Sequence, residues 1–324
     1  MTNTSLPNRA KATNPLALGT IAQSFRFSSD TGGDRPLGCT PNWGNDMKTL
    51  LIAAALSALA APAHAQSSDA ALPDPNDRSD TFTIGAGVGF VPDYEGSDDY
   101  RLIPAVAARG RISGISFFTR GTYLYVDVVP RGSGKIDFDA GPIAGVRLNR
   151  TGKIKDDFVD RLPERDAAIE VGGFVGITAH GLTNPYDALS FRVDVVKDLA
   201  DGHGSTVITP TLDFGTPVSR TTYIGASLSA DFVGEGYADS YFSITPGEAL
   251  ASGLRAYDVD GGYKGWKVGL LANQTLSGDL TRGLSLFGTG TYGRLAGDFR
   301  RSPIVADRGS ASQWFGAIGL GYTF

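Results

Sequence analysis

Residues 312–324 read Ser-Gln-Trp-Phe-Gly-Ala-Ile-Gly-Leu-Gly-Tyr-Thr-Phe, and this stretch decides the fold class. Its large apolar residues occupy alternate positions and are separated by small or polar ones; they are Trp314, Ile318, Leu320, Tyr322 and Phe324. Because side chains at every second position share one face of a β-strand, the pattern predicts a strand with one apolar face.

The same period of two recurs upstream of this segment. We count twelve alternating runs, at 82–91, 101–109, 112–119, 122–130, 136–149, 167–179, 187–198, 204–215, 221–233, 264–276, 282–295 and 312–324. A soluble β-sandwich also alternates. However, many runs reach the roughly ten residues that a tilted membrane strand needs, and their polar faces carry small residues and isolated charges. We therefore predict an all-β fold, a transmembrane antiparallel up-and-down β-barrel, because only a closed sheet pairs every backbone group in hydrocarbon without helices.

Loop lengths agree with this prediction. If the chain enters from the periplasm at Thr81, the periplasmic turns are short, at 110–111, 131–135, 180–186, 216–220 and 277–281. The long external loops are then 92–100, 150–166, 234–263 and 296–311, although two further external connections, 120–121 and 199–203, are short. An even strand number returns the C-terminus to the periplasm. About twelve strands are expected, with ten to fourteen left open, since 234–263 is long enough for another hairpin.

The aromatic ending of the last strand suggests how the chain is inserted. A final strand that closes on an aromatic residue is similar to the signal read by the barrel-insertion machinery of Gram-negative bacteria. We assign this role to Tyr322 and Phe324.

The first 80 residues are expected to lie outside the barrel. Residues 47–65 have the charge, apolar run and small-x-small ending of a signal peptide, which places the mature start at Gln66. We interpret 1–46 as a disordered, non-native upstream extension and 66–80 as a flexible periplasmic lead-in to a barrel spanning 81–324. The only cysteine, Cys39, precedes the signal, so the mature chain would have no thiolate site and no lipid-anchoring cysteine.

Composition excludes several other classes of protein. The formal net charge is -5, and an acidic chain argues against nucleic acid as a partner. No phosphate-binding glycine loop precedes a helix, so Gly85, Gly87 and Gly89 are expected to be strand glycines. We expect no cofactor and no structural metal.

Several segments resemble the MipA/OmpV family (MltA-interacting protein) of outer-membrane proteins. The most specific is Pro92-Asp93-Tyr94-Glu95-Gly96-Ser97-Asp98-Asp99-Tyr100-Arg101; others are 170–174, 241–246 and 319–324. The resemblance covers about 82–324. It implies a barrel in the cell outer membrane, in contact with lipid and lipopolysaccharide. One member is described as a scaffold that joins a murein transglycosylase to a murein synthase.

Two polar groups could carry chemistry. His203 and Ser205 lie two residues apart, as in barrel enzymes that modify lipids, but no third group to orient the histidine is evident. A polar turn is the favoured interpretation of 201–205. The acidic residues Asp93, Glu95, Asp98 and Asp99 could bind a divalent cation. We favour a solvated external loop for this motif, which comprises Tyr94, Glu95, Gly96, Ser97, Asp98 and Asp99.

Charged residues on the polar faces are expected to point into the lumen. They are Asp127, Asp137, Asp139, Arg147, Glu170, Arg192, Asp194, Asp213, Asp231 and Lys267. Paired across a narrow interior they would plug it, which we favour; unpaired, they would line a weakly cation-preferring pore.

These observations lead to one main functional hypothesis and two alternatives. We expect a non-enzymatic barrel that acts as a scaffold or surface-interaction protein. The scaffold role, in which it would link murein synthase with murein hydrolase, is implied by the family resemblance alone. The alternatives are a small-solute channel and a lipid-modifying enzyme that uses His203 and Ser205.

Overall fold

The computed structural model describes residues 79–132 and 134–324. The expected upstream extension, the signal peptide, Cys39 and the lead-in as far as residue 78 lie outside the described residues.

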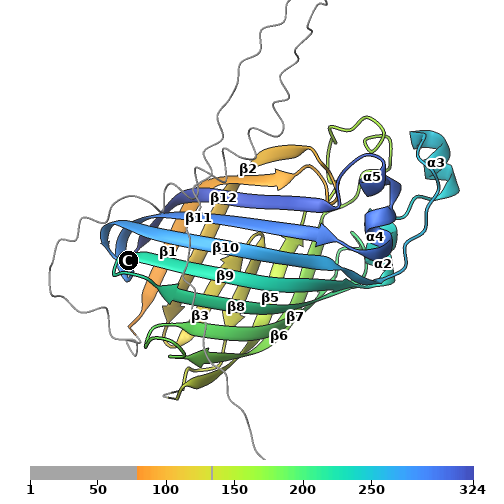
Figure 1. Ribbon diagram of the computed structural model, residues 1–324. Coiled ribbons are helices and arrows are strands. Elements are labelled where there is room, and N and C mark those ends of the chain that lie inside the picture. Colours follow the sequence, from red (N-terminus) through yellow and green to blue (C-terminus); the bar gives the residue numbers. More distant parts are fainter. Residues whose placement is uncertain (1–78, 133) are drawn as a thin grey trace, which may run out of the picture. The chain divides into compact units, whose positions relative to one another are not determined.

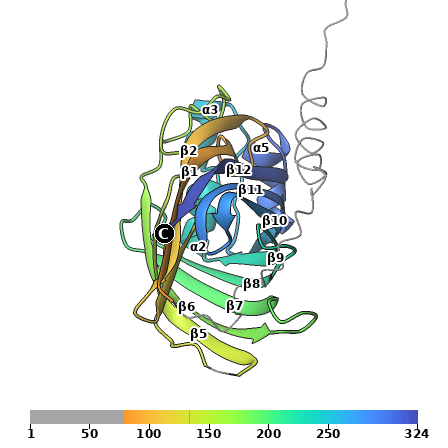
Figure 2. The ribbon, with the colours of Figure 1, turned by 90° about the vertical axis from the view of Figure 1, so that its left-hand side faces the viewer.

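Twelve strands form one closed antiparallel barrel, in which each strand pairs with its neighbours in the chain and β1 pairs with β12 (Figure 1). This confirms the predicted fold and strand number. The strands are β1 (Thr81–Pro92), β2 (Tyr100–Ile112), β3 (Ile115–Arg120), β4 (Tyr123–Asp127), β5 (Ile136–Arg147), β6 (Ala168–His180), β7 (Ala188–Asp198), β8 (Thr206–Pro217), β9 (Thr222–Val233), β10 (Gly262–Asp279), β11 (Arg282–Leu295) and β12 (Ser312–Thr323). Figure 2 views the barrel from the end that carries the C-terminus.

One predicted turn is wrong. The first short turn lies at 113–114, whereas the sequence suggested 110–111. Ser113 and Gly114 both have positive φ, at 52° and 84°. Two consecutive positive φ values are the mark of the tight hairpin turn that matches the strand twist, and the apolar alternation does not reveal it.

The long loop after β9 holds helices instead of a further hairpin. These are α2 (Glu235–Tyr241) and α3 (Pro246–Ser252), and the loop after β11 holds α4 (Gly297–Arg301) and α5 (Pro303–Ala306). Thr245 and Glu248 form a reciprocal capping box at the start of α3, and Gly253 ends it in the left-handed conformation. In the described part of the chain, no helix has the length and apolar character needed to cross a bilayer.

The outer face of the sheet is apolar along the middle of the strands. Large apolar side chains are exposed there on strand after strand, including Leu102, Val106, Phe138, Val175, Leu212 and Leu270. In Val175, 63 % of the side chain is exposed, although it lies in the middle of β6. A soluble protein does not leave such a continuous apolar surface in contact with water.

Outward aromatic residues gather at both ends of this apolar face. At the end that carries the helices, Trp266, Tyr292 and Trp314 of β10, β11 and β12 form a row, with ring centroids 5.6 and 4.9 Å apart. Phe90 stacks on Tyr100 at the same end of β1 and β2, with centroids 4.4 Å apart.

The opposite end has its own aromatic group. Phe82 lies 5.9 Å from Phe117 and 6.1 Å from Phe324, and Tyr322 lies 4.8 Å from Phe324 between ring centroids. The predicted insertion-signal residues therefore lie in the second aromatic girdle. Two girdles that flank an apolar band are the surface pattern of a membrane β-barrel.

Glycine is required where neighbouring strands approach closely. A Cβ added at Gly172 in β6 would lie 1.9 Å from the carbonyl oxygen of Val195 in β7. A Cβ at Gly290 in β11 would meet no atom within 4 Å.

We expect Gly172→Ala to destabilise the barrel by about 1–3 kcal/mol, because the methyl group must push two paired strands apart. Gly290→Ala is the matched control and should leave stability unchanged. The measurement is the urea midpoint of unfolding in detergent; equal midpoints for the two variants would contradict the prediction.

Candidate functional site: the capped mouth of the barrel

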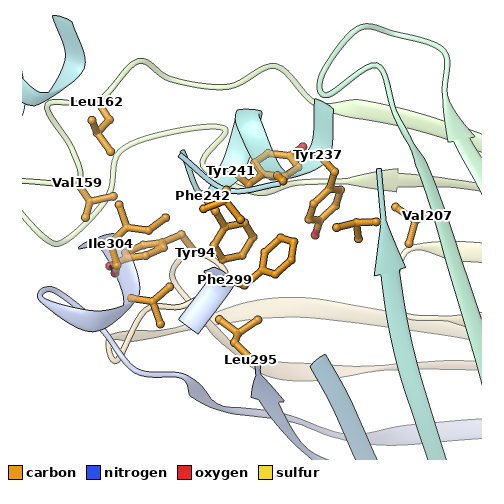
Figure 3. Close-up of a cluster of buried hydrophobic side chains, with 14 of the residues drawn as sticks. Tyr94, Val159, Leu162, Val207, Tyr237, Tyr241, Phe242, Leu295, Phe299 and Ile304 are labelled. Atoms are coloured by element: carbon orange, nitrogen blue, oxygen red, sulfur yellow. Dashed lines mark hydrogen bonds between the residues drawn. The ribbon is translucent and has the colours of Figure 1, made fainter. Parts of the chain in front are cut away.

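The apolar core of the molecule lies at one mouth of the barrel. Figure 1 shows helices α2 to α5 at the end opposite the C-terminus, and Figure 3 shows the buried side chains that these helices and their loops contribute. They come from four different loops and include Tyr94, Val159, Leu162, Tyr237, Tyr241, Phe242, Phe299 and Ile304. The Tyr94 hydroxyl donates to the carbonyl oxygen of Ile304 at 2.8 Å, which ties the first loop to the last. We call this packed group of loops the cap.

Directly beneath the cap lies a set of ionised side chains, which we call the mouth cluster. Its members are Glu95, Glu170 and Asp231 on the acidic side and Arg147, Lys264 and Lys267 on the basic side. The formal charges of the cluster balance. Because most members are shielded from water, each charge needs a partner to offset its desolvation.

One half of the mouth cluster centres on Lys264. Its Nζ lies 2.6 Å from Glu95 Oε1 and 3.3 Å from Asp231 Oδ2, and only 4 % of its side chain is exposed. The Tyr237 hydroxyl of α2 donates to Glu95 Oε2 at 2.5 Å and accepts from Lys264 at 3.0 Å. The cap is therefore joined to the barrel wall by buried, charge-assisted hydrogen bonds.

The other half centres on Glu170, whose side chain is fully buried. Arg147 binds its two oxygens through Nε at 2.7 Å and Nη2 at 3.1 Å. Tyr123 donates to Oε2 at 2.5 Å, and His203 Nε2 lies 2.8 Å from Oε1. The Arg147 guanidinium also lies over the ring of Tyr237, 5.1 Å from its centroid, so the two halves are in contact.

The surroundings of His203 bear directly on the enzymatic alternative. Its Nδ1 accepts from the backbone N–H of Ser205 at 3.2 Å, so Nε2 carries the proton that it donates to Glu170. Both ring nitrogens are occupied, and the side chain has no exposed surface. Glu170 is the orienting carboxylate that the sequence did not reveal, but the imidazole has no free nitrogen to activate the Ser205 hydroxyl.

A second layer of charges lies deeper in the barrel. Arg192 Nε lies 2.6 Å from Asp194, and its Nη1 lies 3.8 Å from Asp213, which also pairs with Arg120 at 2.5 Å. The guanidinium of Arg192 is surrounded by aromatic rings, with centroid distances of 5.6, 5.0 and 5.8 Å to Phe118, Tyr125 and Phe174, respectively. The side chains of this layer come from strands between β3 and β8 and lie on the inner face of the sheet.

The remaining acidic residues lie towards the opposite end. Asp137 Oδ2 is 3.1 Å from His180 Nε2, and Asp139 accepts from the Thr178 hydroxyl at 2.5 Å. Asp127 accepts backbone N–H groups of Val129 and Ala140. All ten residues expected in the lumen thus lie on the inner face of the sheet, but they form three separate groups.

The expectation of a solvated motif loop is wrong. Asp93 and Tyr94 are buried, at 3 % and 2 % exposure, and Glu95 is part of the mouth cluster. Gly96 adopts a φ of 104° and donates its N–H to Gln313 Oε1, while Ser97 is 1 % exposed. Only Asp98 and Asp99 face the solvent. The loop is folded inward because Tyr94 and Glu95 pack into the cap and onto Lys264, and strand alternation cannot predict these contacts.

The described residues contain no group of three or more His, Cys, Asp or Glu side chains placed to hold a metal ion. The two carboxylates at the start of this loop, Asp93 and Glu95, are instead used in hydrogen bonds within the chain. Asp93 accepts the backbone N–H of Lys155 at 2.8 Å and lies 3.9 Å from Arg101.

Lys264 is the most important residue that the sequence did not single out. A bulge interrupts the β9–β10 pairing between Tyr263 and Gly265, so both Lys264 and Gly265 are buried on the inner side. With strict alternation, Lys264 and Lys267 are three residues apart and would point to opposite faces of the sheet. The Tyr-Lys-Gly sequence at the strand start is the only local signal of this bulge.

Electrostatics explain how the cap stays in place. Desolvation alone would raise the pKa of Glu95, but the positive charges of Lys264 and Arg147 outweigh it and hold that pKa below the ordinary value of 4.5. Burial raises the pKa of Tyr237 well above its usual range, so its hydroxyl keeps its proton and remains a donor to Glu95.

We expect Lys264→Met to destabilise the protein by about 3–5 kcal/mol, because Glu95 and Asp231 would lose their shared buried cation. Lys267→Met is the control. Its side chain is 37 % exposed, so we expect a loss of about 1 kcal/mol or less. Thermal unfolding of both variants in the same detergent measures the difference, and a larger loss in Lys267→Met would refute the assignment.

A pH titration provides an independent check of Glu95. Since its folded-state pKa is lowered, its contribution to stability is fully present above the ordinary pKa of 4.5 and is lost as the pH falls through the folded value. The unfolding midpoint of the unaltered chain should therefore fall more steeply below that pH than the midpoint of Glu95→Gln. Parallel curves for the two proteins would show that Glu95 does not contribute in this way.

Known proteins with similar structures are distant. The chain aligns with an anion-selective porin from Comamonas acidovorans at 11 % identity and a TM-score of 0.33, covering 76 % of this chain and 99 % of the porin. It aligns with the translocator domain of the autotransporter NalP from Neisseria meningitidis at 13 % identity and a TM-score of 0.29, covering 86 % and 95 %. At this level of similarity neither structure is a guide to the function of this chain. No curated protein matches the sequence.

Comparison of the sequence with models of protein families, by contrast, identifies the family. The model of the family described as MltA-interacting protein MipA matches residues 84–324. This range extends from β1 to the last residue and contains every member of the cap and of the mouth cluster. The chain therefore belongs to the MipA family.

Proposed function

We propose that this protein is a β-barrel of the outer membrane that works by binding protein partners. The membrane location is supported by the exposed apolar band, of which Val175 and Leu212 are part, and by the aromatic girdles at its two ends. Backbone closure through β1 and β12 supplies the hydrogen bonds that hydrocarbon cannot.

The orientation follows from the lengths of the connections. Strand β1 begins at Thr81 and strand β12 ends at Thr323, and both residues lie at the end of the barrel with the short turns. In barrels of the outer membrane the short turns face the periplasm and the long loops face outward. In this orientation the cap closes the external mouth.

The packing of the cap over the mouth is the observation that favours binding over conduction. A small-solute channel needs a continuous water-filled path, whereas here Tyr237 and its neighbours cover the lumen and the charges beneath them are paired. Lipid modification through His203 is disfavoured because both nitrogens of its ring are already bonded.

The family description names the partner to be tested, the murein transglycosylase MltA. Murein lies in the periplasm, so such a partner would meet the short turns. Two neighbouring turns there expose apolar side chains, Leu182 at 53 % and Val218 at 57 %. The Asn184 side chain donates to Thr216 Oγ1 at 3.0 Å and joins the first turn to the end of β8, where the second turn begins. In this proposal they dock the transglycosylase, and a murein synthase would complete the scaffold.

The test is capture of a purified transglycosylase of the MltA type by the full chain in detergent. We expect the chain to retain it and Leu182→Asp to weaken retention by at least about tenfold, as expected when a charge replaces an apolar contact at the centre of an interface. Leu250→Asp is the matched control, because Leu250 is 89 % exposed on α3 at the other end and should not affect capture.

Planar-bilayer conductance separates the proposal from the channel alternative. The unaltered chain should show no stable open steps. Stable steps together with failed capture would overturn the proposal, as would equal capture by the two aspartate variants.

A further inference from the structure

The loop between β5 and β6 contains a small pocket inside the cap. It has a volume of about 270 Å³ and is lined by residues of 150–164, among them Arg150, Gly152, Lys153, Asp160 and Glu164. The pocket lies entirely within one loop and is separate from the mouth cluster.

Arg150 is a buried cation without a counter-ion. It is 3 % exposed, and within residues 79–132 and 134–324 it takes part in no salt bridge. Its Nη2 donates to the carbonyl oxygen of Pro163 at 3.0 Å, but its Nη1 is buried and has no hydrogen-bond partner. An unpaired charge in such a position is costly unless an anion or water completes its bonding.

The neighbouring charges do not supply that anion. Among the charged groups that influence the pKa of Arg150, Arg165 has the largest effect. It has the same sign and is itself paired with Glu248 at 3.0 Å. Burial, followed by the effect of Arg165, lowers the pKa of Arg150 to about 10, so the guanidinium is still charged at neutral pH. The positive charge therefore persists. Glu248, which pairs with Arg165, offsets it in part but forms no ion pair with Arg150 among the described residues.

The backbone at Arg150 is also unusual. Its φ is 58°, in the left-handed region that residues other than glycine seldom adopt, and only Ser113 and Asp201 share this property among the described non-glycine residues. Such conformations are maintained where the surrounding structure requires a particular side-chain position. Arg150 is one of the residues that line the pocket.

We propose that this pocket binds a small carboxylate, whose oxygens bond to Nη1 of Arg150. A guanidinium matches a carboxylate in shape and charge. Asp160 and Glu164 also line the pocket, so a doubly charged phosphate would be repelled more strongly than a singly charged carboxylate. The volume suits a ligand of a few heavy atoms, or the carboxylate end of a larger molecule.

Entry of the ligand requires only local movement. Nη1 exposes almost no surface, so the pocket must widen slightly for the bond to form. The residues from 148 to 167 form neither helix nor strand, and Lys153 on the pocket wall is exposed. This inference does not depend on the proposed partner.

The experiment uses the full chain in detergent at neutral pH, with acetate as the probe. Saturation transferred from the protein to the acetate methyl protons is measured by NMR, with Arg150→Met as the test variant. Arg300→Met is the control, since Arg300 is an exposed arginine of the cap with no ion pair in the described parts of the chain. We expect transfer for the unaltered chain and for Arg300→Met, and loss of most of the signal in Arg150→Met.

A second arm keeps the test decisive if Arg150→Met folds poorly. In Arg150→Lys the charge remains but the fork of donors is lost, so acetate binding should weaken at least about tenfold. Unchanged acetate transfer in a folded Arg150 variant would overturn the proposal. So would absence of transfer in the unaltered chain, which would mean that water alone fills the pocket, or displacement of acetate by an equal concentration of inorganic phosphate.

Discussion

The hydrogen-bonded closure of β1 onto β12 is the constraint on which the rest of the structure depends. Pairing from Thr83 opposite Thr323 to Phe90 opposite Gly316 leaves the sheet without a free edge. A closed single-layer sheet has only an outer face and an inner face, so each strand must sort its side chains between them. Most of the large apolar residues face outward and most of the charged residues face inward, although Phe118, Tyr125 and Phe174 also lie on the inner face, around Arg192.

Closure also creates the electrostatic problem that the interior solves. Inward charges such as Glu170 and Asp231 are removed from bulk water, and they are retained because arginine and lysine side chains reach them from other strands. The cap increases this shielding, and Tyr237 bonds to the same cluster. Packing of the cap and pairing of the charges therefore stabilise each other: neither the apolar core nor the mouth cluster would be well shielded alone.

Much of the fold was predictable, and the failures have physical causes. Long runs in which apolar and polar or small residues alternate, as in β12, identified the strands. Each residue of such a strand faces either the outer or the inner environment. The turn at 113–114 and the bulge beside Lys264 were missed because they depend on backbone dihedral angles and pairing register. The helices α2 and α3 were missed because their buried residues face other loops of the cap, not a repeating surface.

The candidate site was predicted as a set of residue types, without its connections. The sequence identified Arg147, Glu170 and His203 as separate features, but their contacts join residues 23 and 33 positions apart. Glu95 was assigned to a solvated loop, whereas it reaches Lys264 across 169 positions. Such pairings depend on which strands lie side by side and on where the loops fold.

The sequence by itself determined the barrel class, a strand number of about twelve and the assignment of most side chains to the two faces of the sheet, because a strand repeats every two residues and each face meets a different environment. Only the tertiary structure decided that the cap packs over the mouth, that the motif loop turns inward and that Arg150 has no ion pair within the described residues. These features arise from contacts between loops distant in sequence, whose energies depend on burial and geometry that no local pattern records.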